Sequence, residues 1–240
     1  MRAWRDRALS VLHLGEVGYP EALELQARLV GCRRRGEVPD TLLLLQHPHV
    51  VTIGSAGGDR HLLLPRRELA ERGIGLFETG RGGDVTYHGP GQVVGYPILD
   101  LKPDRRDLHA YLRSLEAVLI DALATFGITA DRDETATGVW VESAKVAAIG
   151  IRVSSGWITS HGFALNVATD LSYFGAIVPC GLQGRPVTSV ERILGREVAP
   201  AALHRAIAAA MVREFGYGRA ESDEVPLECR QGASASCKGS

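Results

Sequence analysis

One segment restricts the fold more than any other part of the chain. Between residues 108 and 126, apolar side chains recur at every third or fourth position, which places them on one face of a long helix. Asp107 can cap the start of this helix and Gly127 can end it. An amphipathic helix in a protein is stabilised mainly by packing of its apolar face. The rest of the chain must therefore supply a surface for that face.

Strands are expected on both sides of this helix. Short runs of strand-forming residues, bounded by turn residues, occur at 41–45, 50–53, 93–99, 137–141, 145–153, 157–160 and 163–167. Further helices are expected at 20–35, 66–71 and 200–215. Because helices and strands alternate without a strict βαβ rhythm, the pattern predicts one α/β (α+β) domain with a mixed sheet.

Length, charge and hydropathy exclude several classes of protein. The 240 residues fit one large or two small domains, and 27 basic against 28 acidic side chains leave a net charge of −1, so no bulk nucleic-acid-binding surface is indicated. No apolar run approaches the roughly 20 residues that cross a bilayer, and residues 1–7 lack the apolar core of a signal peptide. We therefore expect a soluble, cytoplasmic protein that binds neither nucleic acid nor membrane.

The four cysteines are widely scattered and form no Cys-x-x-Cys pair. Cys32 lies on the apolar face of its predicted helix, whereas Cys229 and Cys237 lie in a small, polar stretch, 226–240, that is expected to be a flexible tail. An intracellular chain of this size needs no disulfide staple. All four cysteines are therefore expected to be reduced thiols.

The most unusual segment is Gly80–Gln92, with five glycines and a proline in thirteen residues. It cannot form a helix interior, yet Arg81, Thr86 and His88 supply fixed polar groups. It lacks the terminal Gly-Lys-Ser/Thr of a phosphate-binding loop, and Val85 stands where a dinucleotide fingerprint needs its last glycine. The segment fits either an ordinary glycine-rich hairpin or a substrate-binding loop.

Two residues in the second half of the sequence, Lys145 and Cys180, are candidates for catalytic roles. Lysine supplies only three of the 27 basic residues, yet Lys145 sits in an apolar strand, either as an edge residue reaching solvent or as a tunable cation. Cys180 lies between Pro179 and Gly181, which fits a thiol presented on a loop or a small hydrophobic residue at a strand end. A neutral thiol is a weak nucleophile, so a reactive Cys180 needs a nearby cation, and Lys145 is a candidate.

The histidines give weaker signals. His47 and His49 flank a proline, but no third ligand stands at a useful spacing, so no metal is expected. His161 opens a predicted strand and can face a site.

Three separated segments together resemble one family, the lipoyl(octanoyl) transferases, which attach octanoyl groups to lipoyl domains. The segments are Arg81–Gln92, Lys145–Arg152, and His161–Asn166 with its continuation Ile177–Gly181. Val187–Val190 also fits the family pattern. Three matches in order make the resemblance specific, and it extends from about residue 9 to residue 218.

The resemblance implies the catalytic fold of the biotin and lipoate protein ligases, a mixed sheet flanked by helices. It also implies one octanoyltransferase catalytic domain over residues 1–225, with a ligase-like core at about 36–219 and the tail 226–240 outside it.

By the same resemblance, Cys180 is the nucleophile that carries the acyl group as a thioester, and Lys145 lowers the pKa of its thiol and assists proton transfer. The residues implied to bind substrate are Arg81, Gly82, Gly83, Asp84, Val85, Thr86, Tyr87, His88, Ala148, Ile149, Gly150, Gly162, Phe163 and Ala164. Among them, Val85, Ile149 and Phe163 offer apolar contacts for an eight-carbon chain.

The implied partners are octanoyl-acyl carrier protein as donor and, as acceptors, apo lipoyl domains of 2-oxoacid dehydrogenase complexes and the glycine cleavage protein. Transfer through a cysteine gives ping-pong kinetics and needs no ATP, metal or other cofactor. Because both carrier classes are acidic, a local basic face around the cleft is expected. Two other hypotheses stay open: an ATP-dependent lipoate or biotin ligase of the same fold, and a non-catalytic module that only holds the acyl chain.

Overall fold

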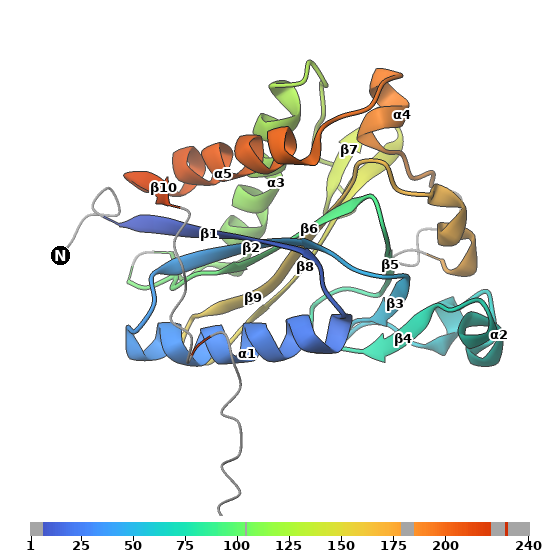
Figure 1. The fold of residues 1–240 in the computed structure, drawn as a ribbon, viewed down its shortest axis with the longest axis horizontal. Coiled ribbons are helices and arrows are strands. Elements are labelled where there is room, and N and C mark those ends of the chain that lie inside the picture. Colours follow the sequence, from blue (N-terminus) through green and yellow to red (C-terminus); the bar gives the residue numbers. More distant parts are fainter. Residues whose placement is uncertain (1–6, 104, 179–184, 222–228, 230–240) are drawn as a thin grey trace, which may run out of the picture.

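The computed structural model describes residues 7–103, 105–178, 185–221 and Cys229 (Figure 1). Cys180 and most of the expected tail, 226–240, lie outside the described residues. Within the described part of the chain, no helix combines the length and the apolar character that crossing a bilayer requires.

A seven-stranded sheet forms the centre of the molecule (Figure 1). In spatial order its strands are β10 (Arg219–Glu221), β1 (Ala8–Glu16), β2 (Asp40–Gln46), β6 (Gln92–Ile98), β9 (Thr159–Asn166), β8 (Ala144–Val153) and β7 (Val139–Val141). β10 and β2 run parallel to β1, and the remaining neighbours are antiparallel, which confirms the predicted mixed sheet. The two strands expected at 157–160 and 163–167 are one strand, β9, while β1 and β10 escaped the sequence analysis.

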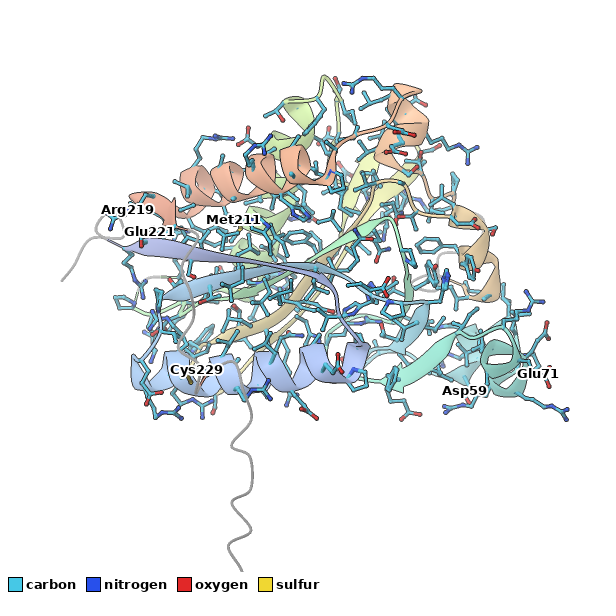
Figure 2. The ribbon with its side chains drawn as sticks, viewed as in Figure 1. Asp59, Glu71, Met211, Arg219, Glu221 and Cys229 are labelled. Atoms are coloured by element: carbon cyan, nitrogen blue, oxygen red, sulfur yellow. A yellow bond between two sulfur atoms is a disulfide. The ribbon has the colours of Figure 1, made fainter. Side chains whose placement is uncertain are left out.

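Helices cover both faces of this sheet (Figure 1). α1 (Tyr19–Arg35) lies on one face, and α3 (Leu108–Ala124) and α5 (Pro200–Phe215) lie on the other. Asp107 caps α3 as predicted, because its carboxylate accepts two backbone N–H groups of the first turn. Met211 of α5 is fully buried on the side that faces the sheet (Figure 2). The amphipathic helix thus packs on the surface that its sequence requires.

A second, three-stranded sheet lies beside the first and consists of β4 (Gly75–Glu78), β3 (Val50–Ile53) and β5 (Val85–His88). The sequence predicts only a loop between Thr79 and Gly91, and β5 corrects that expectation. β5 is a strand because it pairs antiparallel with β3, a contact between distant residues. The shorter elements are η2 (Asp59–His61), α2 (Arg66–Glu71), η3 (Leu171–Ala176) and α4 (Val190–Leu194).

A disulfide joins Cys32 to Cys229, which corrects the expectation of four reduced thiols. Both residues are buried, and Cys229 lies beside α1 (Figure 2), packed in the same apolar cluster as Leu29. The two cysteines are 197 residues apart, with Cα atoms 6.5 Å apart, so their spacing in the sequence gave no sign of the pairing. Glu37 lies close to both sulfur atoms, but disulfide sulfur is not the thiolate that binds metals.

The disulfide predicts the thiol count of the purified protein. Of four cysteines, two are joined, so protein denatured without reductant should give two titratable thiols, and reduced protein should give four. Titration with an aromatic disulfide reagent measures both numbers, and a Cys229→Ala variant should give three thiols under either condition. Four thiols in the denatured, unreduced wild type would contradict the pairing.

Candidate active site

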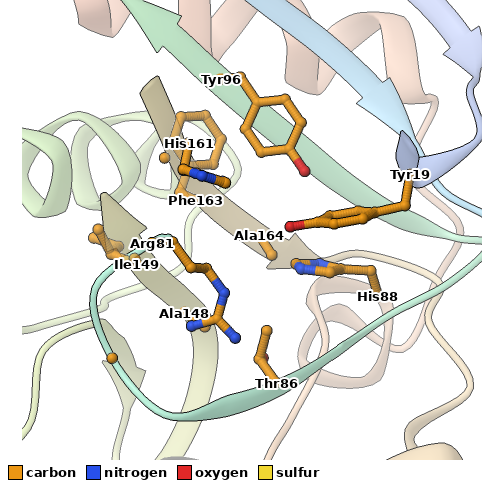
Figure 3. A pocket seen from close by; sticks show the side chains of 13 residues that line it. Tyr19, Arg81, Thr86, His88, Tyr96, Ala148, Ile149, His161, Phe163 and Ala164 are labelled. Carbon is orange, nitrogen blue, oxygen red and sulfur yellow. The ribbon is translucent and has the colours of Figure 1, made fainter. Parts of the chain in front are cut away.

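Two adjoining cavities lie between β8, β9 and the loop that precedes β5. The first, the slot, has a volume of about 40 Å³ (Figure 3) and is lined by Tyr19, Arg81, Gly83, Thr86, His88, Tyr96, Ala148, Ile149, Gly150, His161, Gly162, Phe163 and Ala164. The second, the vestibule, has a volume of about 400 Å³ and is lined by Ala56, Gly82, Gly83, Asp84, Leu112, Thr135, Ala136, Thr137, Lys145, Ile149, Gly150 and Ile151. Gly83, Ile149 and Gly150 line both, so the two cavities meet at these residues.

The floor of the slot is a stretch of β-ladder. Ala148, Ile149 and Gly150 of β8 lie opposite residues 164, 163 and 162 of β9. Two of the segments that carry the family resemblance therefore form one surface, although they are separate in the sequence. Ile149 and Phe163 contribute its larger apolar side chains.

The glycine-rich loop crosses this floor at very short range. Gly82 donates its backbone N–H to the carbonyl oxygen of Ile151 at 2.8 Å. A Cβ atom on Gly150 would lie 2.8 Å from the carbonyl oxygen of Gly82, which is closer than real side chains allow. Glycine at position 150 is therefore required for the loop to reach the sheet.

Arg81 fastens this loop. Its guanidinium is buried and donates to the carbonyl oxygens of Thr52 and Asp84, each at 2.7 Å, and to that of Gly82 at 3.1 Å. Several fixed donors on one planar group suit this task, because they bind loop and strand together. Arg81 is thus a slot residue whose main contacts hold the loop in place.

β5 divides its side chains between two environments. Thr86 and His88 line the slot, whereas Val85 and Tyr87 line neither cavity. The latter two are buried in the apolar cluster around the small sheet, and the Tyr87 hydroxyl lies 2.7 Å from Nδ1 of His49. Successive strand residues point to opposite faces. Val85 and Tyr87 therefore point away from both cavities, and their predicted contact with substrate stays a prediction.

Lys145 is buried at the vestibule, with 7% of its surface exposed. Its Nζ donates to the carbonyl oxygen of Thr137 at 3.1 Å and lies 4.8 Å from the centroid of the Trp140 ring. Gly138 borders the side chain, since a Cβ there would lie 3.2 Å from Cε of Lys145. These contacts do not support the alternative of an edge-strand lysine reaching solvent.

Cys180 lies outside the described residues, but the chain on either side of it is described. On one side, Val178 donates its N–H to the carbonyl oxygen of His61 at 2.8 Å. On the other side, Lys145 donates its backbone N–H to Pro186 at 2.9 Å and accepts that of Thr188 at 3.0 Å. Residues 186–188, which follow Cys180 in the sequence, are therefore paired with the backbone of Lys145.

The opposite side of the vestibule is connected to the segment before Cys180. His61 Nδ1 lies 2.5 Å from a carboxylate oxygen of Asp84, and Asp84 lines the vestibule. The described residues before Cys180 thus contact the vestibule through His61 and Asp84, and those after it contact the vestibule through Lys145.

A second cation lies beside Lys145, and the sequence analysis missed it. The Arg185 guanidinium stacks 3.7 Å from the centroid of Trp140 and donates to Asp133 at 2.6 Å. This hydrogen bond holds the pKa of the Asp133 carboxyl well below its usual range. Trp140 therefore has two cations over one ring, and each makes a cation–π contact with it. Neither Trp140 nor Arg185 belongs to a recognisable local motif.

The slot also contains polar residues that sequence reasoning did not assign, Tyr19 and Tyr96, with His161 noted only as able to face a site (Figure 3). Burial, together with nearby positive charge, lowers the pKa of His161 to about 4 and that of His88 to about 3. Burial raises the pKa of Tyr96. At neutral pH these three side chains are uncharged, so Arg81 is the charged residue among those that line the slot.

Comparison with known proteins identifies the family of this chain. The family model of the lipoyl protein ligase A/B catalytic domain matches residues 18–212, so the chain belongs to that family. It is 55% identical over 205 residues to the octanoyltransferase of Rubrobacter xylanophilus, which covers 85% of this chain and 92% of that protein. To the octanoyltransferase of Solibacter usitatus it is 56% identical over 177 residues, covering 74% and 80% respectively.

Solved structures of lipoate ligases share the fold. Lipoate-protein ligase A bound with ATP superposes with a TM-score of 0.72 at 16% identity, covering 94% of this chain and 91% of that chain. The bi-partite lipoate protein ligase from Thermoplasma acidophilum gives a TM-score of 0.72 at 17% identity, covering 94% and 89%. At this identity the likeness establishes the fold alone, which is the ligase-like fold that the sequence predicts.

The short approach at Gly150 gives a test of the slot. Gly150→Ala should lower kcat/KM for acyl transfer at least tenfold, about 1.4 kcal/mol, because the new methyl group must displace the loop from the slot floor. Gly58→Ala is the matched control, because a Cβ there meets nothing within 4 Å. Both variants are compared with the wild type by steady-state kinetics and circular dichroism. Equal rates for Gly150→Ala and the wild type would show that the slot is not used.

Proposed function

We propose that this chain is an octanoyltransferase that moves an octanoyl group from acyl carrier protein, through a thioester on Cys180, to a lysine of an apo lipoyl domain. One observation carries the proposal: the buried ammonium of Lys145 stands at the vestibule, and its backbone pairs with the segment that follows Cys180. The names of relatives at about half identity support the same activity. The reaction takes place in the cytoplasm, on the lipoyl domains of 2-oxoacid dehydrogenase complexes and the glycine cleavage protein.

The first step exchanges one thioester for another. A cation beside a thiol lowers its pKa, so Lys145 favours the thiolate of Cys180. The thiolate attacks the octanoyl carbonyl carbon, and the bond between that carbon and the carrier's sulfur breaks. The departing thiolate takes a proton from Lys145, and the carrier leaves as a thiol. The enzyme then holds the octanoyl group on Cys180 and a neutral Lys145.

The second step restores the enzyme. The amine of the acceptor lysine attacks the Cys180 thioester, an amide bond forms, and Cys180 leaves as a thiolate. Neutral Lys145 accepts the proton that the amine loses, so both residues return to their starting states. An amide is more stable than a thioester, so the sequence runs forward without ATP. The vestibule and the adjoining slot together hold the acyl chain during both steps, with Ile149 lining both cavities and Phe163 lining the slot.

The ligase alternative has weaker support. The ligase structures resemble this chain in fold at 16–17% identity, whereas the relatives at 55–56% identity are octanoyltransferases. The basic face expected for acidic carriers stays a prediction. Arg185, which shares the Trp140 ring with Lys145, is paired with Asp133.

The decisive experiment uses the full chain with octanoyl-acyl carrier protein and no ATP or acceptor. Intact mass spectrometry with peptide mapping should find one octanoyl group on Cys180, and added apo lipoyl domain should remove it. Cys180→Ala should form no adduct. Transfer that requires ATP and free octanoate would favour the ligase. Tight binding of octanoyl-acyl carrier protein without any transfer would favour the non-catalytic module that only holds the acyl group.

The proposed role of Lys145 predicts a difference in thiol reactivity. Lys145→Ala should slow iodoacetamide labelling of Cys180 at pH 7 about fivefold or more, because the thiolate loses its cation. Lys145→Arg should label at nearly the wild-type rate but transfer poorly, because arginine keeps the charge and cannot exchange the proton. Peptide mapping distinguishes Cys180 from the other thiols.

Lys102→Ala serves as the matched control, because that lysine is exposed and lies near Asp100 on another part of the surface. Its labelling and transfer rates should equal those of the wild type. Identical labelling of Lys145→Ala and the wild type would remove Lys145 as the activating cation.

A further inference from the structure

A third cavity, the groove, lies beside the slot. It has a volume of about 640 Å³ and is lined by α1, by the start of the glycine-rich loop and by the β8–β9 hairpin, with Leu23, Gln26, Thr79, Arg152 and Ser160 among its residues. Among the described residues, His161 is the one that lines both the slot and the groove. His161 therefore stands at the boundary between a narrow cavity and a much larger one.

The backbone of His161 has an unusual conformation. Its φ is +55°, in the left-handed region that residues other than glycine rarely adopt. Such a conformation persists only where the surrounding structure holds it, and it is found most often at functional sites. His161 lies opposite Ile151 in the β8–β9 ladder, so its displacement would disturb the slot floor.

Gln26 holds His161 in this conformation. Its side-chain Oε1 accepts the backbone N–H of His161 at 2.7 Å, a contact between residues 135 positions apart. Gln26 is 3% exposed, and among the described residues its Nε2 has no hydrogen-bond partner. A buried donor without a partner is unfavourable. The hydrogen bond that Oε1 accepts from His161 therefore explains why an amide side chain is buried at this position.

The imidazole of His161 completes the boundary on the slot side. It packs edge-on against Tyr96, with ring centroids 6.3 Å apart and an interplanar angle of 89° (Figure 3). Burial keeps the ring uncharged at neutral pH, since its pKa is lowered to about 4. The boundary is thus a packed, polar, neutral surface at one side of an otherwise mainly apolar slot.

We propose that Gln26 and His161 form the end wall of the acyl slot and set the longest acyl chain that the enzyme transfers. The inference rests on the proposed function and goes further by naming the residues that select chain length. An alkyl chain that exceeds the slot has to displace His161 and break its bond to Gln26 before it reaches the groove. Gln26 is a positioning residue in this proposal, because it acts through His161.

The test measures the ratio of kcat/KM for dodecanoyl- and octanoyl-acyl carrier protein. Gln26→Ala should raise this ratio at least tenfold, because each methylene that gains a buried site changes binding roughly fourfold. His161→Gly should raise it as well, because glycine adopts a φ of +55° without strain and only the ring is lost. A merely structural defect lowers both rates and leaves their ratio unchanged.

Glu24→Ala is the matched control on the same helix, because Glu24 is exposed and pairs with Arg28 on the solvent side. Its ratio should equal that of the wild type. Thermal unfolding verifies that each variant is folded.

Two results would overturn the end wall: a wild type that transfers dodecanoyl as well as octanoyl, or an unchanged ratio in both wall variants. A wild type that transfers neither group would instead defeat the proposed function. Calorimetric titration with free octanoate and dodecanoate then tests the wall directly. Dodecanoate should bind Gln26→Ala at least tenfold more tightly than the wild type, and equal affinities would overturn the wall.

Discussion

The antiparallel pairing of β8 with β9 is the contact on which the site depends. It brings Ile149 opposite Phe163 and Gly150 opposite Gly162, and these residues form the floor of the slot. The glycine-rich loop then lies on this floor through the bond from Gly82 to Ile151. Since strand residues alternate between faces, a shift of the pairing by one residue would turn the floor side chains to the opposite face. The ladder register therefore fixes the site before any catalytic group is considered.

The two cations beside this floor have different tasks, and their chemistry explains the difference. Arg81 donates to three backbone carbonyl groups in fixed directions, and a planar guanidinium that stays charged suits such a clamp. Lys145 donates to the carbonyl oxygen of Thr137 and lies over the ring of Trp140. An ammonium of this kind can give and take a proton, which arginine cannot do. A chain that uses arginine for most of its cations has a lysine at the position where the proposed mechanism exchanges a proton.

The sequence predicted those features of the fold that depend on residues close together in the chain. The cap at Asp107, the α3 helix that follows it and the strand at 50–53 are set by local pattern, and all three agree with the structure. β5 was missed because it exists only through pairing with β3. Once β5 is known to be a strand, the alternation of side chains between its two faces places Thr86 and His88 on the slot side and Val85 and Tyr87 on the other side. The slot residues Tyr19 and Tyr96 had no local signal, since their role follows from where α1 and β6 cross the site.

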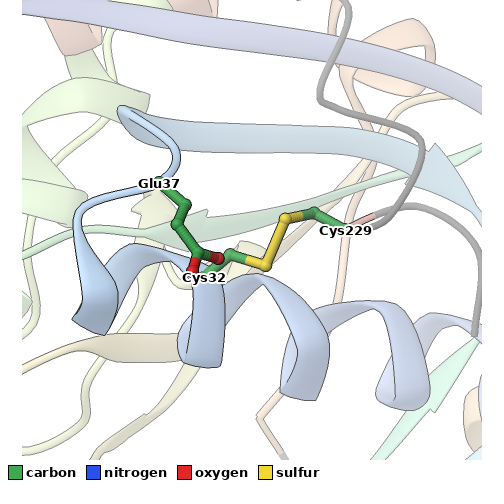
Figure 4. Close-up of side chains that lie close together, drawn as sticks. All are labelled: Cys32, Glu37 and Cys229. Atoms are coloured by element: carbon green, nitrogen blue, oxygen red, sulfur yellow. A yellow bond between two sulfur atoms is a disulfide. The ribbon is translucent and has the colours of Figure 1, made fainter. Parts of the chain in front are cut away.

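α1 connects the site to a part of the chain outside the matched family region. Tyr19, Gln26 and Cys32 all lie on its buried face, at spacings of about two helical turns. Tyr19 lines the slot, Gln26 bonds to His161, and Cys32 is joined to Cys229 (Figure 4), which lies beyond residue 212. Because a packed helix moves as a unit, sliding α1 would disturb all three contacts together. The disulfide therefore restrains the same helix that forms one side of the slot, and the restraint comes from 197 residues away in the sequence.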